Sequence, residues 1–177
     1  MVTRMITAHT GELTPEELRA VRTMLDASFD DDFTDDDWEH GLGGTHVMVL
    51  EGDAVIAHGS LVLRRLLHGG RSLRAGYVEG VAVRPDRRGS GHATTVMAGL
   101  ESLASAYDLL ALSASDDGVA LYESRGWELW RGPTSVLAPT GIEPTPDDDG
   151  SVYVLSGRTA LDLDGPLTCD WRPGDVW

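Results

Sequence analysis

The stretch VAVRPDRRGSGHA, residues 81–93, decides the fold of this chain. Small apolar residues run into a proline turn that holds three arginines and two glycines, and a helix-compatible segment begins at residue 90. Glycines let the backbone turn sharply where a helix starts, which exposes consecutive N–H groups. With the helix dipole, these groups form a nest that suits a phosphate or pyrophosphate. Arg87 and Arg88 can add charge-assisted contacts to such an anion.

A plain strand-to-helix connection is the alternative interpretation of this turn, because glycine-rich turns are common. The turn is not a Walker loop, since no Gly-Lys-Ser/Thr follows it. The dinucleotide fingerprint G-x-G-x-x-G would need a glycine at position 94, where a threonine stands. Taken alone, the turn leaves phosphate binding and plain connection equally open.

The composition predicts one acidic globular domain over residues 1–177, with 29 Asp+Glu against 14 Lys+Arg and a net charge of −15. Such a charge repels nucleic acid and anionic membrane surfaces and attracts polycations, although solubility alone is the simpler explanation. No apolar run is as long as a membrane span, and the first residues do not resemble a signal peptide. Cys169 stands alone, so we expect no internal disulfide and a cytoplasmic location.

The pattern of apolar residues predicts an α/β fold around a mixed sheet. Residues 14–29 form the first helix, with Thr14 as its cap, Glu17 completing a capping box, and a buried stripe at Leu18, Val21, Leu25 and Phe29. Residues 30–44 are too acidic and glycine-rich to be regular throughout. Strands are expected at 45–50, 54–67, 73–84, 109–114 and 151–156, and helices at 90–106 and 117–126. The first three strands suit an antiparallel meander.

The motif R-x-x-G-x-A, which follows a strand and opens a helix, resembles the acyl-coenzyme A pyrophosphate loop of the GNAT N-acetyltransferase superfamily. The segments DFTDDDWEH, GYVEGVAVR, LYESRGW, GPTSVLAPTG, TPDDDG and CDWRPGDVW are similar to those of the actinobacterial aminoglycoside 2′-N-acetyltransferases. The resemblance implies a single GNAT domain over residues 1–177, with a mostly antiparallel sheet flanked by helices. It also implies acetyl transfer from acetyl-CoA to the 2′-amine of aminoglycosides by direct attack, which confers antibiotic resistance. Dimers are frequent among these relatives, so a homodimer is one expectation.

The resemblance assigns coenzyme binding to the strand end and the arginine-glycine turn. The strand end supplies backbone contacts to the pantetheine arm from Val81, Ala82 and Val83. The turn holds the diphosphate through Arg88, Gly89, Ser90, Gly91, His92 and Ala93.

Two residues are candidates for the proton transfers that acetylation of an amine requires. Glu79 is a charged residue in the otherwise apolar strand GYVEGVAV, and either faces solvent at a strand edge or serves the chemistry. Gly80 favours the second interpretation, because glycine in a strand often marks a bulge or a close ligand approach. By resemblance, Glu79 takes the amine proton through water, and Tyr122 protonates the coenzyme thiolate. Tyr122 is otherwise a core aromatic residue. A backbone N–H near Val81 is the expected donor to the thioester oxygen.

The excess acidic residues lie in the runs 30–37 and 147–149 and in the C-terminal tail. They form either a solvated surface or a binding site for a cationic sugar. The resemblance implies substrate contacts from Asp32, Glu79, Gly80, Ser113, Asp147, Asp148, Asp175 and Trp177. We expect the terminal Trp177 to fold back onto the protein. Trp38 is either a pocket residue or a packing residue.

We expect no metal site, because the histidines at 9, 40, 46, 58, 68 and 92 show no paired ligand spacing. Two alternative functions stay open. The chain acetylates another cationic amine, such as a polyamine, an amino sugar or a peptide N-terminus, or it is a non-catalytic ligand sensor. The presence of both Glu79 and Tyr122 argues against the sensor, which needs neither residue.

Overall fold

The structure is a computed structural model that describes residues 2–30, 32–157 and 159–177. The chain divides into two compact units, residues 1–62 with 78–103 and residues 63–77 with 104–177. Two long strands, β3 (Ala54–His68) and β4 (Arg71–Val83), each contribute one part to each unit. Asp31, which belongs to the predicted acidic run, lies outside the described residues.

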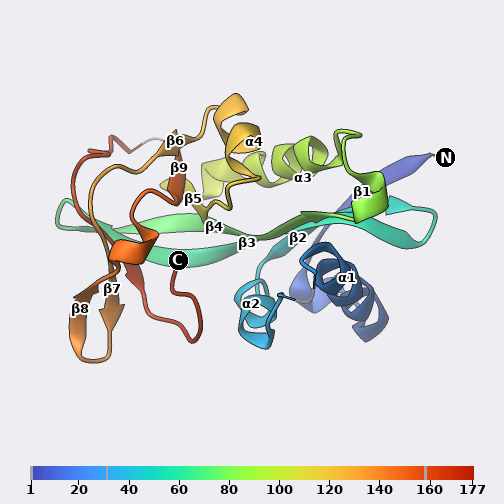
Figure 1. Cartoon of the computed structure of the whole chain (residues 1–177), viewed down its shortest axis with the longest axis horizontal. Coiled ribbons are helices and arrows are strands. Elements are labelled where there is room, and N and C mark those ends of the chain that lie inside the picture. The colour runs from blue at the N-terminus through green and yellow to red at the C-terminus, as the bar shows by residue number, and fades with distance from the viewer. Residues whose placement is uncertain (1, 31, 158) are drawn as a thin grey trace. The chain divides into compact units, whose positions relative to one another are not determined.

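The first unit is built on antiparallel strands. β1 (Thr3–His9) pairs with β2 (Thr45–Glu51), which pairs with the first part of β3. Helices α1 (Pro15–Ser28) and α2 (Asp35–His40) lie on one face of these strands, and α3 (His92–Glu101) lies on the other (Figure 1). The short 3-10 helices η1 (Thr10–Glu12) and η2 (Pro85–Arg87) connect elements of this unit.

Helix α1 begins as its sequence predicts. The Thr14 side chain accepts a hydrogen bond from the Glu17 amide, and the Glu17 side chain closes the capping box. Val21 and Leu25 are buried as expected. The prediction for Phe29 is wrong, because its side chain is 37% exposed at the C-cap, where it stacks on Phe33.

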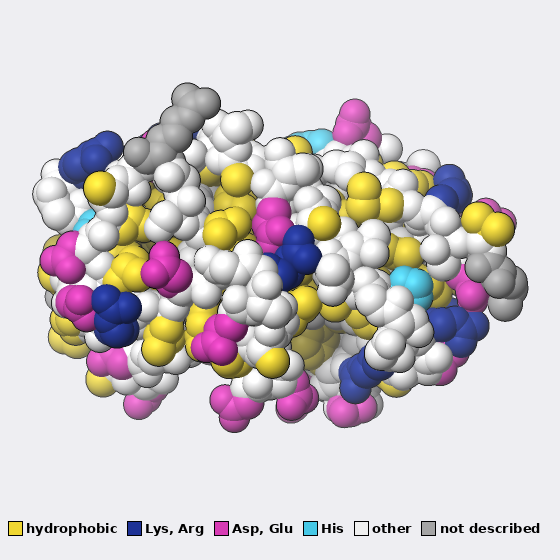
Figure 2. All heavy atoms as spheres, turned by 90° about the horizontal axis from the view of Figure 1, so that it is seen from above, with side chains coloured by type: hydrophobic (Ala, Val, Ile, Leu, Met, Phe, Trp, Pro, Cys, Tyr) yellow, Lys and Arg dark blue, Asp and Glu magenta, His cyan; other side chains and the backbone are white. Residues whose placement is uncertain are grey.

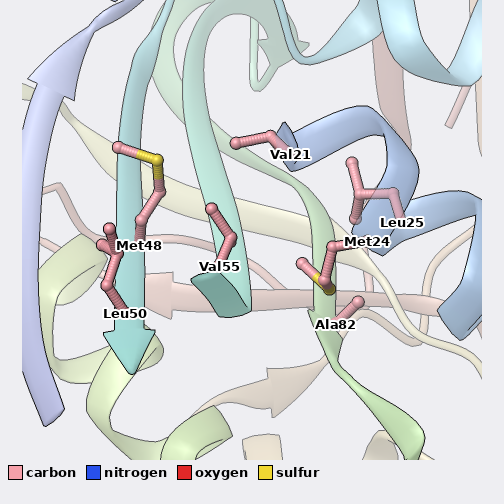
Figure 3. Close-up of a cluster of buried hydrophobic side chains, with 7 residues drawn as sticks. All are labelled: Val21, Met24, Leu25, Met48, Leu50, Val55 and Ala82. Carbon is pink, nitrogen blue, oxygen red and sulfur yellow. The ribbon is translucent and has the colours of Figure 1, made fainter. Parts of the chain in front are cut away.

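The core of the first unit joins α1 to the strands (Figure 3). The cluster consists of Val21, Met24, Leu25, Met48, Leu50, Val55 and Ala82. Each fully buried side chain of this size contributes about 1.5–3 kcal/mol, so the cluster anchors α1 and the end of β4 to one another. Trp38 is partly buried and packs against this cluster from α2.

The second unit carries a mixed, mostly antiparallel sheet with the strand order β6-β9-β5-β4-β3-β10-β7-β8. β4 pairs with β5 (Leu109–Ser113) and β7 (Thr134–Ala138) pairs with β10 (Leu167–Asp170) in parallel, whereas the other pairs for which a register is given are antiparallel. The remaining elements are η3 (Ala104–Ala106), α4 (Val119–Ser124), β6 (Glu128–Leu129), β8 (Gly141–Pro144), η4 (Pro146–Asp148) and β9 (Val152–Ser156). This architecture confirms the predicted fold class.

The structure adds elements that the sequence did not predict. The stretch 30–44, expected to be irregular, contains α2. The strands β1, β7, β8 and β10 were not expected, and the helix expected at 90–106 ends at Glu101. Thr34 and Asp37 form a capping box for α2, which is the sequence signal that could have revealed this helix. None of the described helices is long and apolar enough to cross a membrane.

Candidate active site

The arginine-glycine turn lies in the first unit between η2 and α3. Gly89 and Gly91 have φ angles of 75° and 79°, in the left-handed region that glycine adopts most easily. Gly91 is the N-cap of α3 and offers no side chain to cap it. Among the described residues, no hydrogen-bond partner is found for the backbone amides of residues 89–93. These donors therefore remain available at the helix start for an anion.

The arginines of this turn bind to the protein itself. Arg87 contacts Glu51 and Asp86, both at 2.8 Å. Arg88 donates to the backbone oxygens of Ser28 at 2.8 Å and Val83 at 3.4 Å. The Arg87 guanidinium lowers the pKa of the Glu51 carboxyl, so this pair is charged. These contacts hold the turn in place, and a contact of either guanidinium group with phosphate stays a prediction.

The segment from Glu79 to Val83 ends β4, also in the first unit. Glu79 is half-buried, and its backbone oxygen accepts a hydrogen bond of 3.4 Å from the Ser60 hydroxyl. Gly80 has a φ of 55°, which an L-residue with a side chain rarely adopts, so the backbone is kinked beside Glu79. The register that β4 shares with β5 covers Ala75–Tyr77 only, three residues before this kink.

The remaining residues of this segment differ in burial. Ala82 is 8% exposed and belongs to the core cluster, so its side chain serves packing. Val81 and Val83 are half-buried. The backbone contacts to pantetheine that the sequence predicts for these three residues stay a prediction.

A pair of buried histidines near Gly80 was missed by the sequence analysis. His58 donates to the Gly80 carbonyl oxygen at 2.9 Å, and its other ring nitrogen lies 2.9 Å from His46. Burial lowers the pKa of His58 to about 3 and that of His46 to about 4. Both residues occupy apolar strand runs, which was the available signal: a histidine in a buried strand needs a polar partner.

Tyr122 lies on α4 in the second unit. Its ring is 8% exposed and lies 6.1 Å from the ring of Trp127, measured between centroids. Burial raises the pKa of Tyr122 to about 12, so the phenol stays protonated at neutral pH. It is therefore both a core residue and a competent hydrogen-bond donor. Gly126, predicted to end this helix, has a φ of 85° directly after the C-cap.

Three predicted substrate residues lie together in the second unit. Burial, followed by the charge of Asp175, raises the pKa of Asp148, which places the two carboxylates near each other. Trp177 is 5% exposed, and its indole N–H donates to the Thr145 hydroxyl at 2.9 Å, three residues before Asp148. The predicted return of the C-terminus onto the protein is confirmed. Repulsion between the carboxylates favours a cation at this place.

The tail is also held by Arg172. Its guanidinium donates to the backbone oxygens of Asp175 at 2.8 Å and Trp177 at 3.1 Å. These contacts tie the last residues of the chain to one another.

The other predicted substrate residues are more exposed. Asp147 belongs to η4 beside Asp148, and Ser113 ends β5, where its hydroxyl donates to the Ser151 hydroxyl at 3.2 Å. Asp32 is an exposed residue of the first unit, and its amide donates to the Phe29 oxygen at 3.0 Å. Their roles toward substrate stay predictions. Figure 2 shows that Asp and Glu side chains are spread over the face in view rather than gathered at one point.

The described residues contain no group of three or more His, Cys, Asp or Glu side chains that could hold a metal ion. Burial raises the pKa of the Cys169 thiol to about 11. The cysteine is therefore a neutral thiol at physiological pH and a poor nucleophile.

Comparisons with known proteins agree with this architecture. Residues 9–130 match the family model of the acetyltransferase (GNAT) domain. An aminoglycoside 2′-N-acetyltransferase of Mycolicibacterium fortuitum is 51% identical over 174 residues, which cover 96% of this chain and 89% of that protein.

Two solved structures are similar in fold. A GNAT family acetyltransferase from Brucella melitensis in complex with acetyl-CoA has a TM-score of 0.61 at 15% identity, with 93% of this chain and 94% of that chain covered. Escherichia coli ElaA has a TM-score of 0.60 at 17% identity, with 86% and 99% covered.

Proposed function

This chain belongs to the GNAT acetyltransferase family, and from that premise we propose that it transfers the acetyl group of acetyl-CoA to the 2′-amine of aminoglycosides. The observation that carries the acceptor class is Asp148, whose pKa is raised by burial and then by the negative charge of Asp175, and which lies three residues after Thr145, the partner of the buried Trp177 indole. An aminoglycoside has several ammonium groups, which relieve the repulsion between these carboxylates. Resistance follows because the acetylated drug loses its binding.

The donor substrate fits the arginine-glycine turn. The amides of residues 89–93 have no partner among the described residues, and a Cβ placed at Gly89 or Gly91 would meet no atom within 4 Å. A diphosphate group needs such open, converging donors. The backbone of Val81 to Val83 then takes the pantetheine arm.

Acetyl transfer forms one C–N bond and breaks the C–S bond of the thioester. Glu79 accepts a proton from the substrate ammonium through water, so that the free amine attacks, and the second proton of the nitrogen leaves to solvent as the amide forms. The Val81 N–H stabilises the negative charge that develops on the carbonyl oxygen. Tyr122 donates a proton to the departing thiolate and recovers one from solvent. Burial raises the pKa of Tyr122, which keeps the phenol protonated but makes it a weaker acid, so the proton passes only as negative charge develops on the sulfur. No acyl-enzyme is needed, which agrees with the unreactive Cys169.

The test is thiol release from acetyl-CoA, followed with Ellman reagent. Tobramycin and gentamicin, which carry a 2′-amine, should react, and amikacin, which carries a 2′-hydroxyl, should not. Thiol release only with polyamines or peptides would show that the chain is an acetyltransferase with another acceptor than an aminoglycoside. No release with any amine would overturn the proposed function.

A further inference from the structure

A hydrogen-bonded chain crosses the first unit from η1 to β4. Thr10 Oγ1 lies 2.7 Å from His46 Nε2 on β2. His46 Nδ1 lies 2.9 Å from His58 Nε2 on β3. His58 Nδ1 lies 2.9 Å from the carbonyl oxygen of Gly80 on β4. The two rings are 0% and 2% exposed, and the chemistry described above uses neither of them.

The Gly80 carbonyl oxygen at the end of the chain determines which atom donates in each of its hydrogen bonds. A carbonyl oxygen only accepts hydrogen bonds, so Nδ1 of His58 carries its proton. Both rings are neutral near pH 7 and hold one proton each, since burial lowers their pKa values to about 3 and about 4. Nε2 of His58 therefore accepts from Nδ1–H of His46. Nε2 of His46 in turn accepts from the Thr10 hydroxyl, whose single proton then goes to this nitrogen at 2.7 Å rather than to the Gly44 carbonyl oxygen at 3.2 Å.

The bond to Gly80 fixes more than one atom. A peptide group is planar, and in the trans form the carbonyl oxygen of Gly80 and the N–H of Val81 point in opposite directions. The hydrogen bond from the His58 ring to this oxygen therefore directs the Val81 N–H away from the ring. Glycine populates positive and negative φ with similar ease. At a φ of 55°, Gly80 therefore allows this peptide plane to turn unless a contact holds it.

We propose that His58 and His46 are positioning residues that lock the Gly80–Val81 peptide plane, so that the Val81 N–H points at the thioester oxygen of acetyl-CoA. The inference rests on the proposed function, in which this N–H stabilises the developing oxyanion. A donor that is already oriented before the reaction needs no reorganisation in the transition state. The histidines act through Gly80 and touch no substrate.

Replacing His58 tests the proposal with a matched pair of variants. His58→Leu removes the donor to Gly80, whereas His58→Asn places an amide N–H near the position of Nδ1. Loss of one oxyanion donor costs about 10²–10³-fold in kcat, so we expect His58→Leu to lose about 10–100-fold with both KM values within about threefold. His58→Asn should recover most of this loss. Unchanged kcat in His58→Leu, or no recovery in His58→Asn, overturns the proposal.

Thr10 provides a second pair if the buried leucine prevents folding. Thr10 is half-buried, so its replacement perturbs the core less than that of His58. Thr10→Val removes the hydroxyl that donates to His46 Nε2 at the start of the chain, whereas Thr10→Ser keeps it. We expect kcat to fall in the valine variant and to stay near wild type in the serine variant. Equal kcat values in the two variants count against the chain.

Two spectroscopic measurements separate this inference from the proposed function. Nitrogen-15 NMR of the free protein at neutral pH should find the Nδ1–H form of both histidines, and an Nε2–H form of either overturns the inference. The carbonyl stretch of bound ¹³C-labelled acetyl-CoA should be lowered in wild type and His58→Asn, and should return toward the free value in His58→Leu. These results hold even if no aminoglycoside is acetylated. Equal frequencies in all three proteins overturn the inference, and failure of acetyl-CoA to bind overturns both proposals.

Discussion

His46 and His58 lie on neighbouring strands of the first unit with facing ring nitrogens 2.9 Å apart, and both rings are shielded from water. Burial is the main reason that their pKa values fall to about 4 and about 3. A histidine in an unfolded chain has a pKa of about 6.5. Below that pH the unfolded chain therefore binds more protons than the folded protein.

We expect the free energy of unfolding to decrease as the pH falls from 7.5 to 5.5. The stability contributed by the neutral rings is fully present above the unfolded pKa and is lost toward the folded pKa. The loss is up to about 1.4 kcal/mol per histidine for each pH unit below 6.5. Urea unfolding followed by circular dichroism measures it. His58→Asn removes one titrating ring and should lose about half as much as wild type. An equal loss in both proteins would contradict this origin.

Glu79→Gln keeps the size of the side chain but removes its ability to accept a proton. We expect kcat to fall by about 10²–10⁴-fold, with the largest defect at low pH, where unaided deprotonation of the amine is rarest. Steady-state kinetics from pH 6 to 9 measure this. Glu39→Gln, at an exposed position of α2, is the control and should behave as wild type. A kcat defect of equal size at all pH values would contradict the role of Glu79 as the base.

Tyr122→Phe removes one hydroxyl and keeps the ring that packs near Trp127. We expect kcat to fall by about 10–10²-fold, while the melting temperature changes little. The defect should be constant between pH 6 and 9, because the pKa of Tyr122 is raised to about 12 and the wild-type phenol stays protonated throughout. Tyr153→Phe loses a hydroxyl that donates to Glu123 at 3.3 Å and serves as the control. Equal turnover in the two variants would remove Tyr122 from the mechanism.

Asp148→Asn should weaken substrate binding without weakening the fold. Burial and the charge of Asp175 raise the pKa of Asp148, so its ionised form is costly until a cation binds. Neutralising it should leave the free energy of unfolding unchanged or higher by up to about 1 kcal/mol, after solvent screening. The KM for tobramycin should rise by about tenfold, and most at low salt. The control is Asp53→Asn, in the exposed turn between β2 and β3, which should change neither the free energy of unfolding nor the KM for tobramycin. An unchanged KM in Asp148→Asn would exclude Asp148 from the acceptor site.

Gly91→Ala tests the turn that receives the diphosphate. No atom lies within 4 Å of the added methyl group, so the cost is backbone strain at a φ of 79°. That strain is about 1–2 kcal/mol. The backbone relieves this strain by rotating the amide groups of the loop away from the diphosphate. The KM for acetyl-CoA should therefore rise several-fold, while the KM for tobramycin stays constant. Gly52→Ala, at a φ of 63° with equally open space, carries the same strain in another turn and is the matched control. Equal KM values for acetyl-CoA in the two variants would show that the arginine-glycine turn does not bind the coenzyme.

Local signals account for the elements that the sequence predicted well. The capping box of Thr14 and Glu17 and the apolar spacing after it place α1 almost to the residue, because both act within a few residues of each other. The apolar runs of β2, β3 and β4 are equally plain, since strands buried in a sheet need continuous hydrophobic side chains. The β7–β8 hairpin was missed because its exposed segment Gly141–Pro144 carries no apolar alternation and is held by pairing with β7.

By itself, the sequence determined the order of the main helices and strands, the glycine turn at the start of α3 and the family to which the chain belongs. Tertiary structure decided which partners the charged and polar groups take. Arg87 pairs with Glu51, Arg88 donates to the Ser28 carbonyl oxygen, and His46 and His58 form one directed chain to Gly80. The physical reason is distance along the chain. Propensity and capping act over a few residues, whereas a hydrogen bond between strands depends on a register that only the folded sheet sets.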